Sequence, residues 1–143
     1  MAGIEETIDV DVSAGRAYEI WADFPGYTRF VKGVRRLRRD GDELHWEAKA
    51  GPKSVEWTAR IVAEEPGSRL AWEAPEGPID TDITFESLGP ERTRVVFRER
   101  MHDSLPAEVT AALGAAGSRA RDDLGRYREL AEGRDPDPLG SQD

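Results

Sequence analysis

Apolar and polar residues alternate at the start of the chain and again through its middle, and this period of two predicts β-strands buried on one face. The first predicted strand holds Ile4, Ile8, Val10 and Val12, and its pattern is interrupted at Glu6. Six more strands are expected between Val34 and Met101, separated by Gly- or Pro-containing turns about every ten residues. The first of the six begins at Val34. In the five strands that follow it, the alternating apolar residues are Leu44, Trp46, Ala48, Val55, Trp57, Ala59, Ile61, Leu70, Trp72, Ile79, Ile83, Phe85, Val95, Phe97 and Met101. This arrangement is typical of an antiparallel meander.

Two short helices are predicted between the first strand and these six. Ser13 is a typical N-cap residue, and the helix after it carries Arg16, Ala17, Tyr18, Ile20 and Trp21. Residues 24–26 (Phe-Pro-Gly) are expected to break that helix, because proline and glycine disfavour helical backbone. The second helix is expected to end at Gly33 and to hold Tyr27, Phe30 and Val31.

After Met101 the apolar spacing changes to steps of three and four, which predicts one long amphipathic helix over residues 105–132. The apolar face of this helix is formed by Val109, Leu113, Ala116, Ala120, Leu124, Tyr127 and Ala131. Residues 1–132 are therefore predicted to form a single domain. Residues 133–143 contain two prolines and no apolar period, and we expect them to be a flexible tail.

These elements predict an α+β fold. Its parts are a curved antiparallel sheet of about seven strands, two short helices after the first strand, and a long C-terminal helix packed across the sheet. A single helix does not fill the concave face of a wide, twisted sheet. We therefore expect a cavity between the sheet and the C-terminal helix.

Composition narrows the possible functions. The chain has 143 residues, no cysteine, 20 basic and 29 acidic residues, and a formal charge of -9. The lack of cysteine excludes disulfides, thiol nucleophiles and cysteine-ligated zinc, and a negative chain of this kind is not expected to bind nucleic acid. No apolar stretch reaches the length of a membrane span, and the acidic N-terminus lacks the features of a signal peptide. We expect a cytoplasmic bacterial protein.

Extended parts of the chain resemble the START-like helix-grip superfamily, in particular its polyketide cyclase/dehydrase and lipid-transport branch. The resemblance covers about residues 3–132. It rests on the final helix and on the segments IEETIDVDVSAGRAYEIWADF, FPGYTRFVKGV, EWTARIVAEEPGSRLAWE and TFESLGPERTRVVFR. It implies that the protein binds a hydrophobic or aromatic small molecule, of lipid, quinone or polyketide type, in the cavity under the terminal helix.

The predicted ligand-binding residues are those expected to face this cavity. Aromatic residues at inward strand positions suit either an ordinary core or a pocket wall. Thr81 shares the inward parity and offers a hydroxyl. Gly117 and Gly114, inside the long helix, either are tolerated flaws or leave room for a ligand. The full set is Tyr27, Phe30, Trp46, Trp57, Trp72, Thr81, Ile83, Phe85, Phe97, Glu99, Val109, Leu113, Ala116, Gly117 and Ala120.

Glu99 is the one weak catalytic candidate. It lies between Phe97 and Met101 at an inward strand position, where a carboxylate is costly unless it is paired. One interpretation is a pocket acid with a raised pKa. The other is a carboxylate turned to solvent or neutralised by Arg60, Arg98 or Arg100.

An enzymatic alternative follows from the resemblance: a polyketide cyclase/dehydratase, aromatase-like, acting on a poly-β-ketone in the same cavity. Aromatising cyclases carry a pocket Tyr after the aromatic helix and a pocket Arg beyond the central-strand Trp. These positions fall at Gly33 and Ile61 here, and neither residue can donate a proton or polarise a carbonyl. Binding without strong catalysis is therefore the leading hypothesis.

Three further features complete the sequence-based predictions. The two histidines, His45 and His102, are far apart and suggest neither a metal site nor a resident cofactor. Residues 29–39 hold six basic residues and no acidic one. This basic strip is either a solvated, protected edge strand or the contact surface for an anionic partner. The second option would fit a third hypothesis, a quinone-chaperone or ribosome-associated interaction module.

Overall fold

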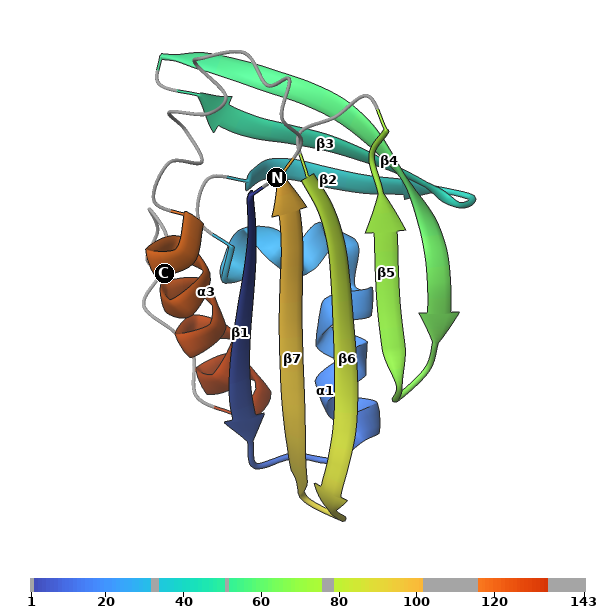
Figure 1. Cartoon of the computed structure of the whole chain (residues 1–143), viewed down its shortest axis with the longest axis vertical. Helices are drawn as coiled ribbons and strands as arrows, with labels where there is room; N and C mark the ends of the chain where they lie inside the picture. The colour runs from blue at the N-terminus through green and yellow to red at the C-terminus, as the bar shows by residue number, and fades with distance from the viewer. Residues whose placement is uncertain (1, 32–33, 51, 76–78, 102–115, 134–143) are drawn as a thin grey trace.

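The computed structural model describes residues 2–31, 34–50, 52–75, 79–101 and 116–133. Within these residues the chain forms one seven-stranded antiparallel sheet in the order β1-β7-β6-β5-β4-β3-β2 (Figure 1). The strands are β1 (Ala2–Val10), β2 (Val34–Asp40), β3 (Glu43–Ala50), β4 (Lys53–Glu65), β5 (Arg69–Glu73), β6 (Ile79–Gly89) and β7 (Arg92–Met101). The predicted antiparallel sheet is confirmed. Consecutive strands from β2 to β7 pair with one another, and β1 pairs with β7.

Glycine makes two of the hairpin turns possible. Gly41 joins β2 to β3 with φ of 64°, and Gly67 joins β4 to β5 with φ of 75°. Other residues rarely adopt this left-handed conformation, because a side chain there meets the neighbouring carbonyl oxygen. The two turns therefore set the pairing of β2 with β3 and of β4 with β5.

A β-bulge bends the longest strand, β4. Ile61 pairs with Trp72 and Ala63 with Ala71, so Val62 is the extra residue between these pairs. The Val62 side chain is 50% exposed. A bulge of this kind kinks a strand and increases the local twist. It therefore contributes to the curvature that separates the β2–β4 half of the sheet from the β6–β7–β1 half (Figure 1).

The two short helices lie on the inner side of the sheet, behind the strands in Figure 1. Helix α1 (Ala14–Ala22) begins at the expected N-cap, where Ser13 Oγ accepts a hydrogen bond from the Arg16 amide. The second element is a 3-10 helix, η1 (Phe24–Arg29). The second helix ends at Arg29, before Phe30 and Val31, which it was expected to hold. Helix α1 stops at Ala22, before residues 24–26, as predicted, but these residues are not a break outside both helices. They form the first turn of η1, where a proline fits because its missing N–H would have no helical partner.

Helix α3 (Ala116–Ala131) is the described part of the predicted C-terminal helix. The predicted start of that helix, residues 105–115, lies outside the described residues, as do residues 134–143 of the predicted tail. Figure 1 places α3 beside β1. Its apolar face is buried at Ala120, Leu124, Tyr127 and Ala131.

Polar contacts hold α3 against the rest of the molecule. The Arg121 guanidinium lies 3.2 Å from the Glu6 carboxylate in β1, so the residue that interrupts the first strand's apolar pattern has a partner on the helix. The Tyr127 hydroxyl donates to the Ala17 carbonyl at 3.0 Å. The Asp11 amide donates to the Glu132 carboxylate at 2.9 Å. The helix is thus tied to both β1 and α1.

Candidate functional site

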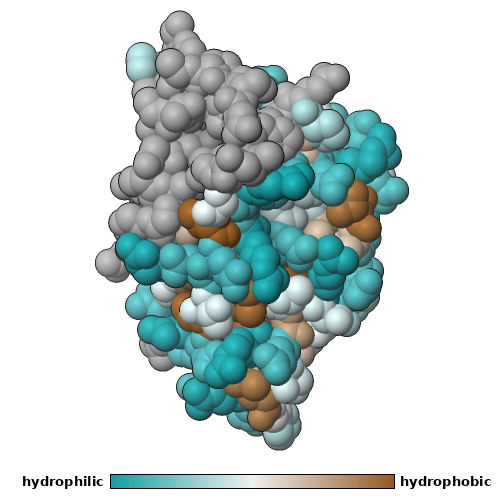
Figure 2. Space-filling view, in the orientation of Figure 1, coloured by the Kyte–Doolittle hydropathy of each residue, from teal (hydrophilic) through white to brown (hydrophobic). Residues whose placement is uncertain are grey.

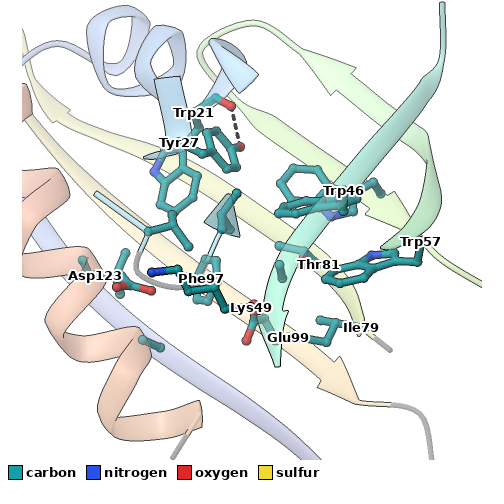
Figure 3. A pocket seen from close by; sticks show the side chains of 16 residues that line it. Trp21, Tyr27, Trp46, Lys49, Trp57, Ile79, Thr81, Phe97, Glu99 and Asp123 are labelled. Atoms are coloured by element: carbon teal, nitrogen blue, oxygen red, sulfur yellow. Dashed lines mark hydrogen bonds between the residues drawn. The ribbon is translucent and has the colours of Figure 1, made fainter. Parts of the chain in front are cut away.

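A cavity of about 80 Å³ lies between the inner face of the sheet, η1 and α3. Figure 3 shows Trp46, Trp57 and Thr81 on one side of it and Trp21, Tyr27 and Asp123 on the other. Most of the residues around it are apolar or aromatic. They are Trp21, Tyr27, Val31, Val34, Trp46, Ala48, Lys49, Trp57, Trp72, Ile79, Thr81, Phe97, Glu99, Ala120, Asp123 and Leu124.

Three tryptophans from neighbouring strands form the aromatic side of the cavity. Trp46 in β3 lies directly across from Trp57 in β4, and their rings are stacked with centroids 5.5 Å apart and 7° between the planes. Trp72 in β5 lies 5.9 Å from Trp46, measured between ring centroids. The alternation of side chains along each strand places all three on one face. Together they offer flat apolar surface to a ligand.

The opposite side is built on Trp21, at the end of α1. Its ring stacks on Phe97 with centroids 5.5 Å apart and packs edge-on against Tyr27 and Phe30. The Tyr27 hydroxyl donates a hydrogen bond to the Trp21 carbonyl at 2.5 Å. Burial raises the pKa of Tyr27 well above its usual value, so this hydroxyl stays protonated. Tyr27 therefore acts as a fixed part of the wall, with its proton committed to the main chain.

The cavity also has a polar part. Thr81 and Glu99 lie side by side on β6 and β7, where they form a cross-strand pair. Asp123 in α3 is 5% exposed and pairs with Arg126. Arg126 in turn donates from Nε to the Phe30 carbonyl at 3.1 Å. This contact links α3 to the chain that follows η1, which carries the cavity residue Val31.

Of the fifteen residues predicted to contact a ligand, the structure brings eight to this cavity: Tyr27, Trp46, Trp57, Trp72, Thr81, Phe97, Glu99 and Ala120. Three others are buried but do not line it, namely Phe30, Ile83 and Phe85. Val109 and Leu113 lie outside the described residues. Ala116 and Gly117 belong to α3, but their side chains are not described, and Gly114 also lies outside the described residues. Ligand contact remains a prediction for every residue of the set.

Phe85 and Ile83 show that the inward strand positions include residues that do not line the cavity. Both have the inward parity of Thr81 and are buried. However, the Phe85 ring meets Tyr18 of α1 at 5.6 Å between centroids. Helix α1 therefore covers this end of β6, and the cavity is confined to the end that holds Ile79 and Thr81.

The cavity contains eight residues that the sequence-based set lacks: Trp21, Val31, Val34, Ala48, Lys49, Ile79, Asp123 and Leu124. Ile79 and Ala48 have the same inward parity as their chosen neighbours, and Leu124 lies on the predicted apolar face of the helix. For these three residues, the spacing of apolar positions in the sequence indicates a place on the cavity side. Lys49 has outward parity and Asp123 is a charged helix residue, so periodicity does not identify either one.

The arginines proposed as partners for Glu99 are engaged elsewhere. Arg98 lies 3.4 Å from Glu5, and Arg100 lies 2.7 Å from Asp80. Arg60 is 4.0 Å from Glu43. All three belong to the outer face of the sheet, while Glu99 belongs to the cavity. Neutralisation of Glu99 by one of these arginines stays a prediction.

No cluster of three or more His, Asp or Glu side chains able to hold a metal occurs within the described ranges. His45 is partly exposed, with Nε2 3.6 Å from Glu43, and His102 lies outside the described residues. None of the described helices is long and apolar enough to span a membrane.

The basic strip at residues 29–39 is partly compensated. Arg39 binds Glu64 through two hydrogen bonds of 2.7 and 3.0 Å. This contact lowers the pKa of Glu64 and raises that of Arg39. Arg35 donates to Ser54 at 2.9 Å. Arg29, Arg36 and Arg38 are exposed, Lys32 lies outside the described residues, and an anionic partner here stays a prediction.

The chain is similar to a known protein family and to a bacterial relative. The model of the family described as "Polyketide cyclase / dehydrase and lipid transport" matches residues 10–126. An uncharacterized 17.2 kDa protein from Streptomyces lincolnensis is 30% identical over 138 residues, which cover 94% of this chain and 92% of the relative.

Several solved structures share the fold. The protein DR_A0006 from Deinococcus radiodurans has a TM-score of 0.72 and 25% identity, covering 92% of this chain and 98% of that one. A START superfamily protein from Mycobacterium smegmatis has a TM-score of 0.67 and 16% identity, covering 90% and 98%. The Zhui aromatase/cyclase from Streptomyces sp. R1128 has a TM-score of 0.68 and 16% identity, covering 92% and 96%.

Proposed function

The chain belongs to the polyketide cyclase/dehydrase and lipid-transport family and has the START-like helix-grip fold, and from this premise we propose that it binds a hydrophobic or aromatic small molecule in the cavity between sheet and α3. The family in general supports either hydrophobic-ligand binding or a cyclase role. The residues of this chain favour binding.

The aromatic cavity wall is the observation that carries this proposal. Trp46, Trp57 and Trp72 present ring surface from three adjacent strands to a space that α3 closes on the other side. Ligand pockets are mostly apolar concavities with a few convergent polar groups. Here Lys49, Thr81, Glu99 and Asp123 supply the polar groups.

The size of the cavity limits the ligand. At about 80 Å³ it is smaller than the ~150 Å³ engineered cavity that accepts benzene and the ~300–1,000 Å³ typical of drug-sized ligands. A ligand that occupies this space therefore inserts a narrow, flat part, or the walls move apart to admit it. Arg126 of α3 donates a hydrogen bond to the Phe30 carbonyl. If α3 moved, this hydrogen bond would either break or hold the chain at Phe30 to the helix, so that the two moved together.

Native mass spectrometry of the purified protein tests the proposal. We expect a bound small molecule or, after delipidation, saturable uptake of an environment-sensitive naphthalene dye that lipids, quinones or polyketides displace. Trp57→Ala should weaken dye binding because it removes half of the stacked pair. Val62→Ala, on the exposed bulge, is the matched control and should bind as the wild type does. The proposal is wrong if none of these ligand classes binds.

A cyclase role is the second candidate, and the position of Glu99 is the observation that favours it. A carboxylate beside Thr81 on an apolar cavity wall supports this role, because a bound poly-β-ketone would need a general acid or base. Against this role, the position corresponding to the pocket Arg of aromatising cyclases is Ile61, which is 9% exposed and does not line the cavity. Gly33, at the position of their pocket Tyr, lies outside the described residues.

Glu99→Gln separates the two candidates, because glutamine keeps the shape and loses the proton-transfer group. If the protein is a cyclase, turnover of a cyclisable poly-β-ketone should fall about 100-fold or more, the usual range for general acid–base catalysis. Binding of a non-reactive dye should change little. Glu5→Gln, on the outer face of β1, is the control. Equal turnover by the Glu99 and Glu5 variants would rule out Glu99 as the catalytic group.

A further inference from the structure

The cavity wall contains a buried hydrogen-bond donor that is not satisfied by any described residue. The Trp46 indole nitrogen is buried and donates no hydrogen bond to any of these residues. Its ring is held by stacking on Trp57 and by contacts with Trp72 and Tyr27. Native proteins rarely leave such a donor without a partner. A tryptophan N–H can donate only, so its missing partner is an acceptor atom.

Trp21 also has a buried indole nitrogen that makes no well-formed hydrogen bond to a described residue, but its surroundings differ. Burial raises the pKa of the Tyr127 hydroxyl, and the Trp21 indole beside it opposes that rise. The Trp21 N–H thus already lies next to an oxygen of the protein. Trp46 is the stronger candidate for contact with a ligand.

A second polar group lies on the same side of the cavity as Trp46 (Figure 3). Thr81 is 5% exposed and pairs across the sheet with Trp72 on one side and Glu99 on the other. Its hydroxyl is a second hydrogen-bond donor on this wall. Two donors on one side of the cavity are matched by a ligand oxygen that only accepts, as a carbonyl oxygen does.

We propose that the Trp46 N–H and the Thr81 hydroxyl form a subsite for a carbonyl oxygen, and that the ligand is a flat aryl ketone or related conjugated carbonyl compound. The flat shape follows from the stacked Trp46–Trp57 pair and the small volume, and the carbonyl follows from the donor. This inference rests on the proposed function, since it specifies the ligand class of the same cavity.

Two nearly isosteric probes test the subsite. 1-Tetralone carries a carbonyl oxygen where tetralin has a methylene group, and the two bicyclic frames are otherwise alike. We expect the wild-type protein to bind 1-tetralone about two- to twelve-fold more tightly than tetralin, the ratio that one neutral hydrogen bond supplies. In ¹H–¹⁵N spectra, the Trp46 indole resonance should move downfield with 1-tetralone and not with tetralin.

Trp46→Phe keeps an aromatic ring and removes the donor, so the two probes should then bind equally. Trp57→Phe is the matched control: it loses the same ring area, retains the Trp46 donor, and should keep the preference for 1-tetralone even if both affinities fall. If Trp46→Phe does not fold, the Trp46 resonance of the wild-type protein still decides the question.

The results of these binding experiments test the Trp46–Thr81 subsite separately from the proposed binding function. Equal binding of both probes by the wild type, with no selective movement of the Trp46 resonance, overturns the subsite and leaves the binding function intact. Retention of the 1-tetralone preference in a folded Trp46→Phe protein also overturns it. If neither probe binds, the subsite fails, and the proposed function is then decided by the dye-displacement experiment with lipids, quinones and polyketides.

Discussion

The two faces of strands β6 and β7 carry opposite chemistry on alternating residues of the same backbone. On the inner face lie Ile79, Thr81, Ile83 and Phe85 of β6 and Val95 and Phe97 of β7, all buried. The intervening residues on the outer face form ion pairs, such as Arg100 with Asp80 at 2.7 Å. Figure 2, which views the outer face, is mostly hydrophilic where the atoms are coloured. One face supplies the apolar core and the cavity, whereas the other carries exposed charge.

The outer face also shows how the positive charges are arranged in this acidic chain. Arg69 binds Asp82 at 2.7 Å, and Arg94 binds Asp9 at 2.9 Å. Arginines of β7 thus lie between carboxylates of β1 and β6 in the paired strands. Exposed pairs of this type add little stability individually. We therefore expect the inner face to control stability and binding, and the outer face to control only how the protein responds to acid.

The largest expected contrast comes from two adjacent residues of β7. Phe97→Ala removes a buried ring that stacks on Trp21, and large-to-small core substitutions of this type cost about 3–5 kcal/mol. Arg98→Ala, on the outer face, should cost less than about 1 kcal/mol. Urea unfolding of both variants measures the difference. Equal losses would contradict the assignment of the two faces.

An intermediate effect is expected for Tyr27→Phe. The substitution removes the 2.5 Å hydrogen bond to the Trp21 carbonyl and leaves that buried acceptor unsatisfied, at a cost of about 1–3 kcal/mol. Because burial keeps the pKa of Tyr27 well above its usual value, the loss should be the same at every pH between about 4 and 9. A loss that changed across this range would show that the hydroxyl titrates.

The smallest effect should come from Asp9 on the outer face, and it should depend on pH. The hydrogen bond from Arg94 lowers the pKa of Asp9 below its model-peptide value of 3.8. A carboxylate whose pKa is lowered on folding stabilises the protein above its unfolded pKa and ceases to do so as pH falls through the folded value. Asp9→Asn should therefore lower Tm at pH 7 by about 2 °C or less.

Thermal unfolding from pH 7 to pH 2.5 checks this prediction. The gap in Tm between the wild type and Asp9→Asn should close as the pH falls below about 4, where the wild-type carboxylate also becomes neutral. A gap that stays constant down to pH 2.5 would mean that the charge of Asp9 does not matter.

Sequence periodicity predicts the fold well, because a period of two identifies the buried face of each strand without knowledge of its neighbours. It placed Trp46, Trp57 and Trp72 on one face, and the cross-strand registers bring them together. η1 begins at Phe24, earlier than the pattern predicts, because proline and glycine suit a helix start as well as a break. Periodicity also does not reveal which end of a buried face another element covers, and this is why Phe85 was included.

The charged residues of the site depend on tertiary contacts. Asp123 is tolerated in a buried position because Arg126, one turn later, pairs with it and with the Phe30 carbonyl. The Glu6–Arg121 pair joins residues that are far apart in the sequence. The amino-acid pattern marks these residues as polar, but only the packing of α3 against β1 and η1 shows what they contact.

The most direct test of the account is chemical-shift mapping of ¹⁵N-labelled protein with tetralin, which contains no hydrogen-bonding group and so depends on the apolar cavity alone. We predict saturable shifts at residues of the inner wall, such as Trp46, Trp72 and Leu124. Outer-face residues on the same strands, such as Arg98, should not move. Shifts confined to the outer face, or no saturable shift at all, would contradict the claim that the inner face is a ligand-binding site.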